Sequence, residues 1–273
     1  MAGIVDQRPG PVAGLPMYDW PEVHDAVDTL WSAISTRLGV AGVDAPVSPW
    51  RPAAPADLWS HPDLLVGETC GAQVVGEYRG RFEVLGVLDH AVDGCRPGDY
   101  RSVLVVRDND PAVGLADLRG RTAVVNERRS QSGCGALVSE VAPLAVDGRF
   151  FGSVVESGAH RASIRMVAGG EGDVAAIDAV SWLLALDHEP ATDGLRILAW
   201  TEPLPAPPMV TGWANGGLRD VLVAVVGEAL TLIDLEVREA LHLYGFVPRT
   251  AADYDVLADR MAAAAAAGYP TLA

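Results

Sequence analysis

The stretch that decides the fold reads Arg121-Thr-Ala-Val-Val-Asn-Glu-Arg-Arg-Ser-Gln-Ser-Gly133. Residues 121–125 end in the apolar run Ala-Val-Val and include three β-branched residues, which predicts a strand. The strand runs into a polar loop over residues 126–133, and the loop opens a predicted helix that continues to about Val141. A strand that delivers a hydroxyl-rich loop to the start of a helix is typical of α/β sheets, in which ligands bind at the carboxyl ends of strands.

The same order of strand, small polar turn and helix recurs on both sides of this stretch. A strand over 151–156 leads through Ser157-Gly158 into a helix from His160, and a strand over 173–177 ends at Asp178 before the helix that contains Trp182. Further strands are predicted over 64–67, 82–88, 102–106 and 195–200, and an N-terminal helix over 22–38. This alternation predicts parallel α/β sheets with helices on both faces.

The chain changes character after Thr201. Four prolines, at 203, 205, 207 and 208, predict an extended crossover rather than a packed element. A mainly helical tail follows, with an apolar segment over 218–235 and an alanine-rich segment over 253–267. We expect this tail to pack on the first lobe of the protein.

Composition narrows the classes of function. With 273 residues, of which 49% are hydrophobic, the chain is long enough for two lobes with a buried core. The formal net charge is −16, and all 20 basic residues are arginines. A nucleic-acid partner is excluded because no run of basic residues could meet a phosphate backbone.

The cysteines and the N-terminal residues are the features that indicate the cellular compartment of the protein. The three thiols, Cys70, Cys95 and Cys134, lack metal-ligand spacing and are expected to be reduced and buried; a Cys70–Cys95 pair is left open. Met1–Gly14 lacks the basic start and apolar run of a signal peptide, and no stretch has the composition of a membrane span. From the sequence as given we expect a cytoplasmic protein, or a periplasmic protein if a signal peptide has been removed.

Three places carry candidate chemistry, each with a structural alternative. Ser130 and Ser132 open a helix whose first N–H groups could hold an anion, although either serine could simply cap that helix. His160 could donate to a ligand, and Asp178 could accept from one or cap the next helix. The sequence contains no dinucleotide fingerprint, Walker loop, nucleophile elbow or metal-ligand cluster, so no cofactor, metal or catalytic residue is expected.

Taken in order, these motifs resemble the PhnD-like phosphate/phosphonate substrate-binding proteins of ABC transporters. The resemblance rests on Asn126…Ser130-x-Ser132-Gly133, on Glu156-Ser-Gly-x-His160-x-x-Ser163 and on Gly172-Asp-Val-Ala-Ala-Ile-Asp178. It implies a type II periplasmic-binding-protein fold, with two α/β lobes joined by two hinge crossovers and a ligand cleft between them. Residues 1–100 and 203–273 would form lobe one, and residues 101–202 lobe two.

The resemblance also implies a set of ligand-binding residues. Ser130, Ser132 and Gly133 would hold an oxyanion, His160 would add a donor, and Asp178 would face the distal or protonated group of the ligand. The remaining members implied by the resemblance are Tyr18, Glu68, Thr69, Cys70, Arg101, Ser102 and Asn126.

The leading hypothesis is a monomeric solute-binding protein. It would close on a phosphonate-, phosphate- or phosphite-like ligand and present it to an ABC importer or a sensor partner. The alternative is a cytoplasmic enzyme on the same fold that acts on a small metabolite in cofactor biosynthesis, because one scaffold hosts many functions. A ligand-gated sensory module is a third possibility.

Overall fold

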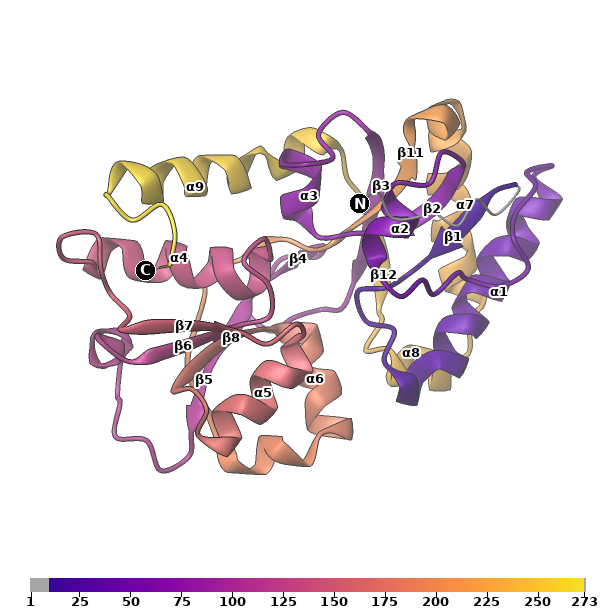
Figure 1. Cartoon of the computed structure of the whole chain (residues 1–273). Helices are drawn as coiled ribbons and strands as arrows, with labels where there is room; N and C mark the ends of the chain where they lie inside the picture. The colour runs from indigo at the N-terminus through magenta and orange to yellow at the C-terminus, as the bar shows by residue number, and fades with distance from the viewer. Residues whose placement is uncertain (1–9, 273) are drawn as a thin grey trace. The chain divides into compact units, whose positions relative to one another are not determined.

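The computed structural model describes residues 10–272, which divide into two compact units (Figure 1). Unit 1 is the chain up to Ala91 together with Pro205–Tyr254, and unit 2 is Val92–Leu204 together with the chain from Asp255. The chain therefore passes from one unit to the other three times. Most of Met1–Gly14, on which the signal-peptide expectation rests, lies outside the described residues.

Unit 1 contains a five-stranded sheet in the order β1-β2-β11-β3-β12. β1 and β2 are parallel, whereas β11 lies antiparallel to both β2 and β3, and β12 is antiparallel to β3. The expectation of purely parallel sheets is wrong because β11 enters the sheet between two earlier strands in the opposite direction. The bounds are β1 (Val12–Gly14), β2 (Leu64–Glu68), β3 (Phe82–Asp89), β11 (Pro208–Gly212) and β12 (Gly245–Pro248).

The N-terminal helix follows its predicted periodicity. Leu30, Ile34 and Leu38 of α1 (His24–Val40) are at most 1% exposed, and the Trp31 indole N–H donates to the Pro46 carbonyl at 2.9 Å. This apolar stripe packs on α7. The other helices of unit 1 are α2 (Pro55–Trp59), α3 (Gly71–Val75), α7 (Arg219–Leu232) and α8 (Leu235–Ala240), with short 3-10 turns over Pro21–Val23, Trp213–Leu218 and Ala251–Tyr254.

The proline-rich segment differs from its prediction. Its last proline, Pro208, begins β11, a fully buried strand in the middle of the unit 1 sheet. A proline is accommodated at the first residue of a strand because no ladder N–H is needed there. The Pro208 carbonyl still takes part in pairing and accepts the Thr69 N–H at 3.0 Å. The prediction of an extended crossover is therefore wrong at Pro208, where a central strand begins.

Unit 2 contains a second five-stranded sheet, in the order β7-β6-β8-β5-β9. β6 is parallel to β7 and β8, whereas β5 is antiparallel to β8 and β9, so this sheet is also mixed. The bounds are β5 (Ser102–Arg107), β6 (Thr122–Val125), β7 (Ser153–Glu156), β8 (Val174–Asp178) and β9 (Leu195–Trp200), all close to the predicted strands. A separate pair joins β4 (Asp99–Tyr100) to β10 (Leu204–Pro205).

The helices of unit 2 follow the strands as the sequence predicts. The main ones are α4 (Ala136–Val141), α5 (His160–Gly169) and α6 (Ala179–His188). A π-helical turn, η3 (Gln131–Gly135), precedes α4 directly. The short turns are η2 (Leu115–Leu118), η4 (Ala142–Leu144) and η5 (Pro190–Gly194).

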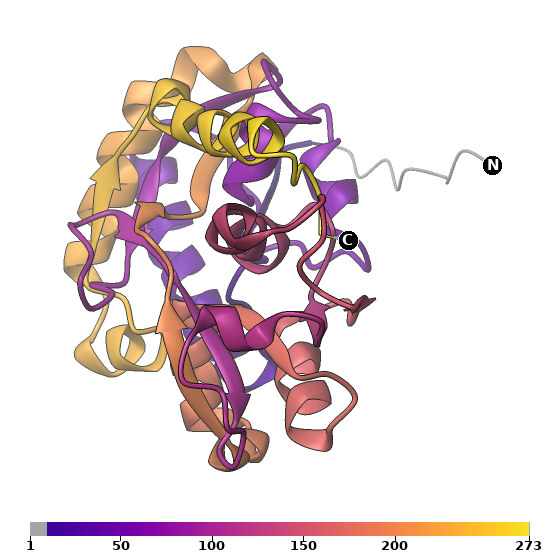
Figure 2. The same ribbon diagram turned by 90° about the vertical axis from the view of Figure 1, so that its left-hand side faces the viewer.

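The C-terminal helix α9 (Asp255–Ala266) packs in unit 2, although we expected the tail to pack on the first lobe (Figure 2). Ala264, Tyr269 and Leu272 are at most 4% exposed and belong to the same apolar cluster as Leu137 and Val141 of α4. Burying this apolar surface against α4 is the physical reason for the difference.

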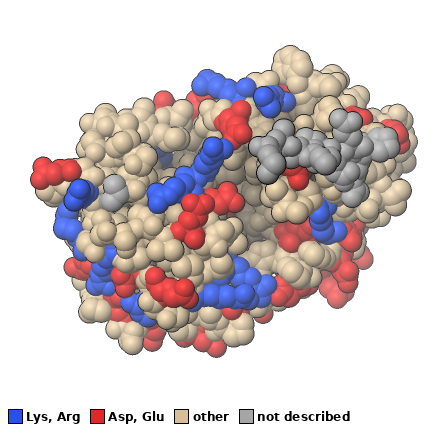
Figure 3. Space-filling view, viewed as in Figure 1, with Lys and Arg blue, Asp and Glu red and all other residues tan. Residues whose placement is uncertain are grey.

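Arginines are paired with acidic residues rather than gathered into a basic face. In unit 2, Arg121 contacts Asp110 at 2.5 Å and Arg107 contacts Asp173 at 2.8 Å. Acidic and basic side chains are interspersed on the face shown in Figure 3. Among residues 10–272, no helix combines the length and apolarity needed to cross a membrane.

Candidate functional site

Three strand ends meet at one edge of the unit 2 sheet. β7, β6 and β8 are neighbouring parallel strands, so their carboxyl ends lie on the same side. The loops that follow them carry the serine turn, His160 and Asp178. Two backbone bonds tie the first two loops together: Ser157 N–H donates to the Val125 carbonyl at 2.9 Å and Gly158 N–H to the Asn126 carbonyl at 2.8 Å.

Ser130 caps the turn that follows β6. Its hydroxyl accepts the Gly133 N–H at 3.1 Å, and its carbonyl accepts the N–H groups of Cys134 and Gly135 at 3.2 and 2.9 Å. The last of these bonds makes the turn π-helical, a rare geometry that is frequent at functional sites. The capping interpretation of Ser130 is therefore confirmed. The turn also presents Ser132, whose own N–H lies in the first turn, where a helix supplies no acceptor.

Ser132 and His160 form the central pair of the cluster. Ser132 Oγ lies 2.8 Å from His160 Nε2, and Ser102 Oγ donates to the Ser132 carbonyl at 2.9 Å, which fixes the turn against β5. Burial lowers the pKa of His160 to about 4, and the facing Ala176 carbonyl opposes this shift only partly. The imidazole is consequently neutral at pH 7, and one proton is shared along the Ser132–His160 bond.

Gly133 lies in close contact with the Asn126 side chain. A Cβ atom at position 133 would lie 1.9 Å from Asn126 Oδ1. This oxygen is buried and has no hydrogen-bond partner within the described part of the chain. Asn126 thus occupies the space beneath the serine turn.

Asp178 ends β8 and caps α6. Its Oδ1 accepts the Val180 and Ser181 N–H groups at 2.8 and 3.1 Å, and the residue is 3% exposed. The capping alternative of the sequence analysis is therefore confirmed. A ligand contact by the same carboxylate stays a prediction.

We expect Asp178→Ala to lower the free energy of unfolding by about 1–2 kcal/mol, because both N–H groups lose their acceptor. Asp178→Asn should retain most of the stability, since an amide oxygen also caps, and should instead alter ligand choice. Urea unfolding measures the free energy of unfolding of both variants. Asp193→Ala, at an exposed carboxylate, is the control and should stay within about 0.5 kcal/mol of the parent. An Asn variant as unstable as the Ala variant would contradict this prediction.

Unit 1 has its own polar cluster at the carboxyl ends of β1, β2 and β3. Glu68 ends β2 and Thr69 follows it; the two residues are 2% and 0% exposed. Glu68 Oε2 accepts the Met17 N–H at 3.2 Å, and the Glu68 carbonyl accepts the Trp59 indole N–H at 3.0 Å. Tyr18, next to Met17, is 7% exposed. The structure thus brings Tyr18 and the Glu68–Thr69 pair to one edge of the unit 1 sheet, and Cys70 follows them at the start of α3.

His90 joins this cluster and was missed by the sequence analysis. It follows β3, and its ring lies edge-on to Tyr18 with 5.0 Å between the centroids. Nδ1 lies 3.2 and 3.0 Å from the carbonyl oxygens of Leu241 and His242. Burial lowers the pKa of His90 to about 4. Its position directly after a strand was the available signal, but the strand was predicted to end at Leu88, one residue before its observed end at Asp89.

Arg101 and Cys70 complete the candidate residues, and a ligand contact by either one stays a prediction. The Arg101 guanidinium stacks on the Trp200 ring at 4.0 Å and lies 3.8 Å from Asp93. No disulfide joins the three cysteines; Cys134 is buried as expected, whereas Cys70 and Cys95 are half-buried. Burial raises the pKa of Cys95 to about 11, so its thiol is protonated at neutral pH. No group of three metal-ligating side chains was found among residues 10–272.

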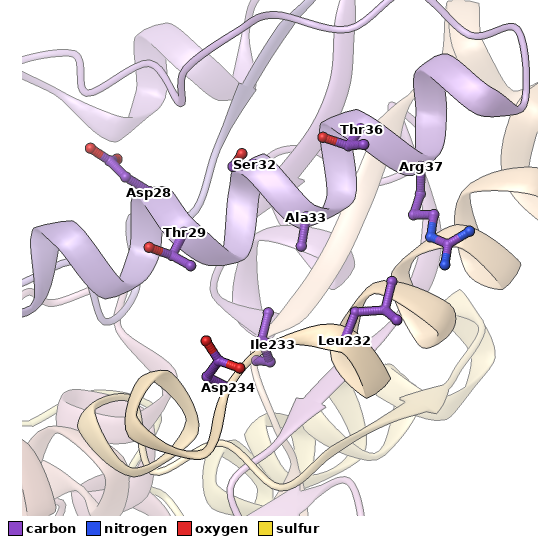
Figure 4. Close-up of a pocket in the computed structure, with 9 residues that line it drawn as sticks. All are labelled: Asp28, Thr29, Ser32, Ala33, Thr36, Arg37, Leu232, Ile233 and Asp234. Carbon is purple, nitrogen blue, oxygen red and sulfur yellow. The ribbon is translucent and has the colours of Figure 1, made fainter.

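A separate groove of unit 1 lies between α1 and the turn that joins α7 to α8 (Figure 4). Asp28, Ser32 and Thr36 line one side of it, and Leu232, Ile233 and Asp234 line the other. The groove contains none of the polar-cluster residues described above.

Comparison with known proteins gives a family and a fold. Residues 69–254 match the family described as "ABC transporter, phosphonate, periplasmic substrate-binding protein". No curated protein sequence matches the chain.

Solved structures are similar over most of the chain. PhnD1 from Prochlorococcus marinus in complex with methylphosphonate has a TM-score of 0.72 and 18% identity, covering 93% of this chain and 97% of its own. XAC2383 from Xanthomonas citri, bound to ATP, has a TM-score of 0.69 and 19% identity, covering 95% and 98%. A binding-protein component of an ABC phosphonate transporter from Pseudomonas aeruginosa has a TM-score of 0.68 and 15% identity, covering 95% and 88%. These likenesses confirm the type II periplasmic-binding fold.

Proposed function

Because the chain belongs to the family of periplasmic substrate-binding proteins of phosphonate ABC transporters, we propose that it binds a small oxyanion through the serine–histidine cluster of unit 2. The ligand class is phosphonate, phosphate or phosphite, and the partner that receives it is an ABC permease or a sensor. The family consists of binding proteins rather than enzymes.

The observation that carries the proposal is the 2.8 Å pair of Ser132 and His160 at the first turn after β6. Hydroxyls and first-turn N–H groups are neutral donors that stabilise a phosphoryl-type oxygen, and the positive end of the helix dipole adds to them. Neutral donors suit a chain with a net charge of −16, because binding then depends on short-range geometry rather than on the overall field.

The enzyme alternative is weaker at this cluster. A serine nucleophile needs a base that is itself oriented, commonly by a carboxylate. Here no carboxylate orients the ring, because His160 Nδ1 is buried and has no hydrogen-bond partner among residues 10–272. The pair therefore resembles a set of ligand donors more than a catalytic triad.

A thermal-shift panel tests the proposal. We expect methylphosphonate, phosphate or phosphite to raise the midpoint of unfolding by several degrees, because a ligand at 100 times its Kd stabilises the folded state by about 2.7 kcal/mol. Sulfate and acetate serve as controls for a general anion effect. Unfolding, dialysing and refolding the protein before the assay removes any retained ligand. No shift from any phosphorus oxyanion in such protein would overturn the proposal.

We further propose that the protein acts as a monomer in the compartment where its family works, outside the cytoplasmic membrane. The family is periplasmic, and this is what supports the location. Light scattering with and without the ligand tests the monomer. A second species that appears only with ligand would instead favour a sensor assembly.

A further inference from the structure

The groove between α1 and the turn that joins α7 to α8 lies entirely within unit 1 (Figure 4). Its volume is about 490 Å³, which leaves room for side chains of another molecule. Asp28, Ser32 and Thr36 follow one another along α1 at intervals of four residues, so they form one exposed row on the helix. Because most side chains in this row are small and polar, a partner can approach α1 closely there.

The opposite wall is apolar and only partly covered by the protein. Leu232, at the end of α7, is 53% exposed, and Leu235, at the start of α8, is 68% exposed. Ile233 is buried between them, so the turn is anchored while the two leucines stay in contact with water. Single exposed leucines are ordinary, but two leucines beside a groove gain free energy when a partner covers them.

The two ends of the groove carry opposite charges. Figure 4 shows the carboxylates of Asp28 and Asp234 at one end and the guanidinium of Arg37 at the other. Arg37 follows Asp28 by nine residues of α1, which separates the two positions by about 13.5 Å along the helix axis. Asp28 contacts Arg51 at 2.7 Å, whereas no ion pair within residues 10–272 involves Arg37 or Asp234. One charge at each end is thus available to a partner.

We propose that this groove binds an amphipathic helix of a partner protein. The apolar face of the partner helix covers Leu232 and Leu235, its basic end lies at Asp234, and its acidic end lies at Arg37. Helices commonly have acidic side chains in the first turn and basic side chains in the last turn. This pattern of charges fits a partner helix that runs antiparallel to α1.

The groove is separate from the proposed oxyanion site and contains none of the residues of the two polar clusters. Variants of the groove should therefore keep the thermal shift that a phosphorus oxyanion causes in the parent protein. If the parent protein binds the helix but no oxyanion, only the proposed function fails. If it binds an oxyanion but not the helix, only the role of the groove is rejected.

Two synthetic peptides test the proposal. Both are held helical by a covalent staple, and both have the same leucines along one face and equal numbers of glutamate and lysine. In the bipolar peptide the glutamates lie in the N-terminal half and the lysines in the C-terminal half, whereas in the alternating peptide they are interspersed. Because each peptide has zero net charge, the net charge of −16 on the protein favours neither of them.

Fluorescence anisotropy with the full chain measures the Kd of each peptide. We expect the bipolar peptide to bind saturably and the alternating peptide to bind about threefold to tenfold more weakly, the scale of two exposed ion pairs. No saturable binding of the bipolar peptide, or equal binding of both peptides, would overturn the proposal.

Matched variants locate the binding site. Leu232→Ser should weaken binding of the bipolar peptide about tenfold, because apolar contact is lost, and Arg37→Asp about threefold to tenfold. Leu186→Ser and Arg96→Asp make the same changes at exposed positions of unit 2 and should bind like the parent protein. Equal losses in the control variants would show that the peptide does not bind in the groove.

A further variant and a second measurement keep the test decisive. Ser32→Trp fills the groove from an exposed position and should abolish binding of the bipolar peptide; it is the deciding variant if urea unfolding shows that Leu232→Ser is unstable. Light scattering of the chain alone examines the other possible occupant, a second copy. A dimer that Leu232→Ser dissociates would assign the groove to that second copy and overturn the proposal.

Discussion

We expect the Ser132→Ala/His160→Ala double variant to bind its oxyanion at least a hundredfold more weakly than the parent protein. In the protein without ligand the two side chains form one 2.8 Å pair. We expect the oxyanion to replace that mutual bond with one hydrogen bond from each side chain, and the double variant loses both. Such bonds contribute about 1.5–3 kcal/mol each, so the pair accounts for about 3–6 kcal/mol, or two to four orders of magnitude in Kd. Isothermal titration with the tightest ligand of the panel measures the loss.

The matched control is Ser153→Ala/His188→Ala. Both residues belong to unit 2, Ser153 is exposed, and neither side chain contributes to the cluster. This variant should bind like the parent protein. Single Ser132 and His160 variants complete a double-mutant cycle, in which we expect a non-additive effect because each residue orients the other. Unchanged affinity in the Ser132/His160 double variant would place the oxyanion elsewhere.

The second large effect is a loss of folding stability at acidic pH. Burial lowers the pKa of both His90 and His160 from 6.5 to about 4. In the unfolded chain these rings take up protons near pH 6.5, whereas in the folded protein they do so only near pH 4. The unfolded state therefore binds more protons across this window, and stability must fall as the pH drops from about 6.5 to 4. Each histidine contributes roughly 3 kcal/mol to the loss.

Urea unfolding followed at pH 7.5, 6.5, 5.5 and 4.5 measures the acid effect. His90→Phe and His160→Phe should each flatten the curve between pH 6.5 and about 5, and the double variant should be flatter there than either single variant. Asp173, Glu189 and Asp253 have lowered pKa values because of bonded N–H groups or arginines, so the stability that they contribute is lost from about pH 5 downward in the parent protein and the variants alike. A pH profile that is the same in the parent protein and the double variant would contradict this account.

Local sequence patterns predicted most elements of unit 2. The segments 102–106, 121–125 and 173–177 are mainly apolar and too short for helices, and each is followed by a polar turn. The type of each secondary-structure element and the order of the elements could therefore be predicted. The same patterns placed Ser132 and His160 at neighbouring strand ends. The structure shows that the two side chains are in direct contact, which spacing alone could not predict.

The remaining differences depend on contacts between distant parts of the chain. Nothing local at Pro208 indicates that a strand will enter between β2 and β3 with reversed direction, because the hydrogen bonds that hold it come from residues far away in sequence. The alanine-rich α9 has no strong apolar stripe, and its unit is decided by the partner surface on α4. His90 was missed for the same reason, since the carbonyls that fix its tautomer are more than 150 residues away.

The path of the chain through the two units also affects how the protein can be synthesised. Unit 1 lacks its central strand until residues 208–212 have been made, and the core of unit 2 lacks Tyr269 and Leu272 until those residues have been made. Neither unit can therefore be completed when its first segment leaves the ribosome. Both unfinished cores are present at once while the chain is being made, and partly folded intermediates with exposed apolar surface are prone to aggregate.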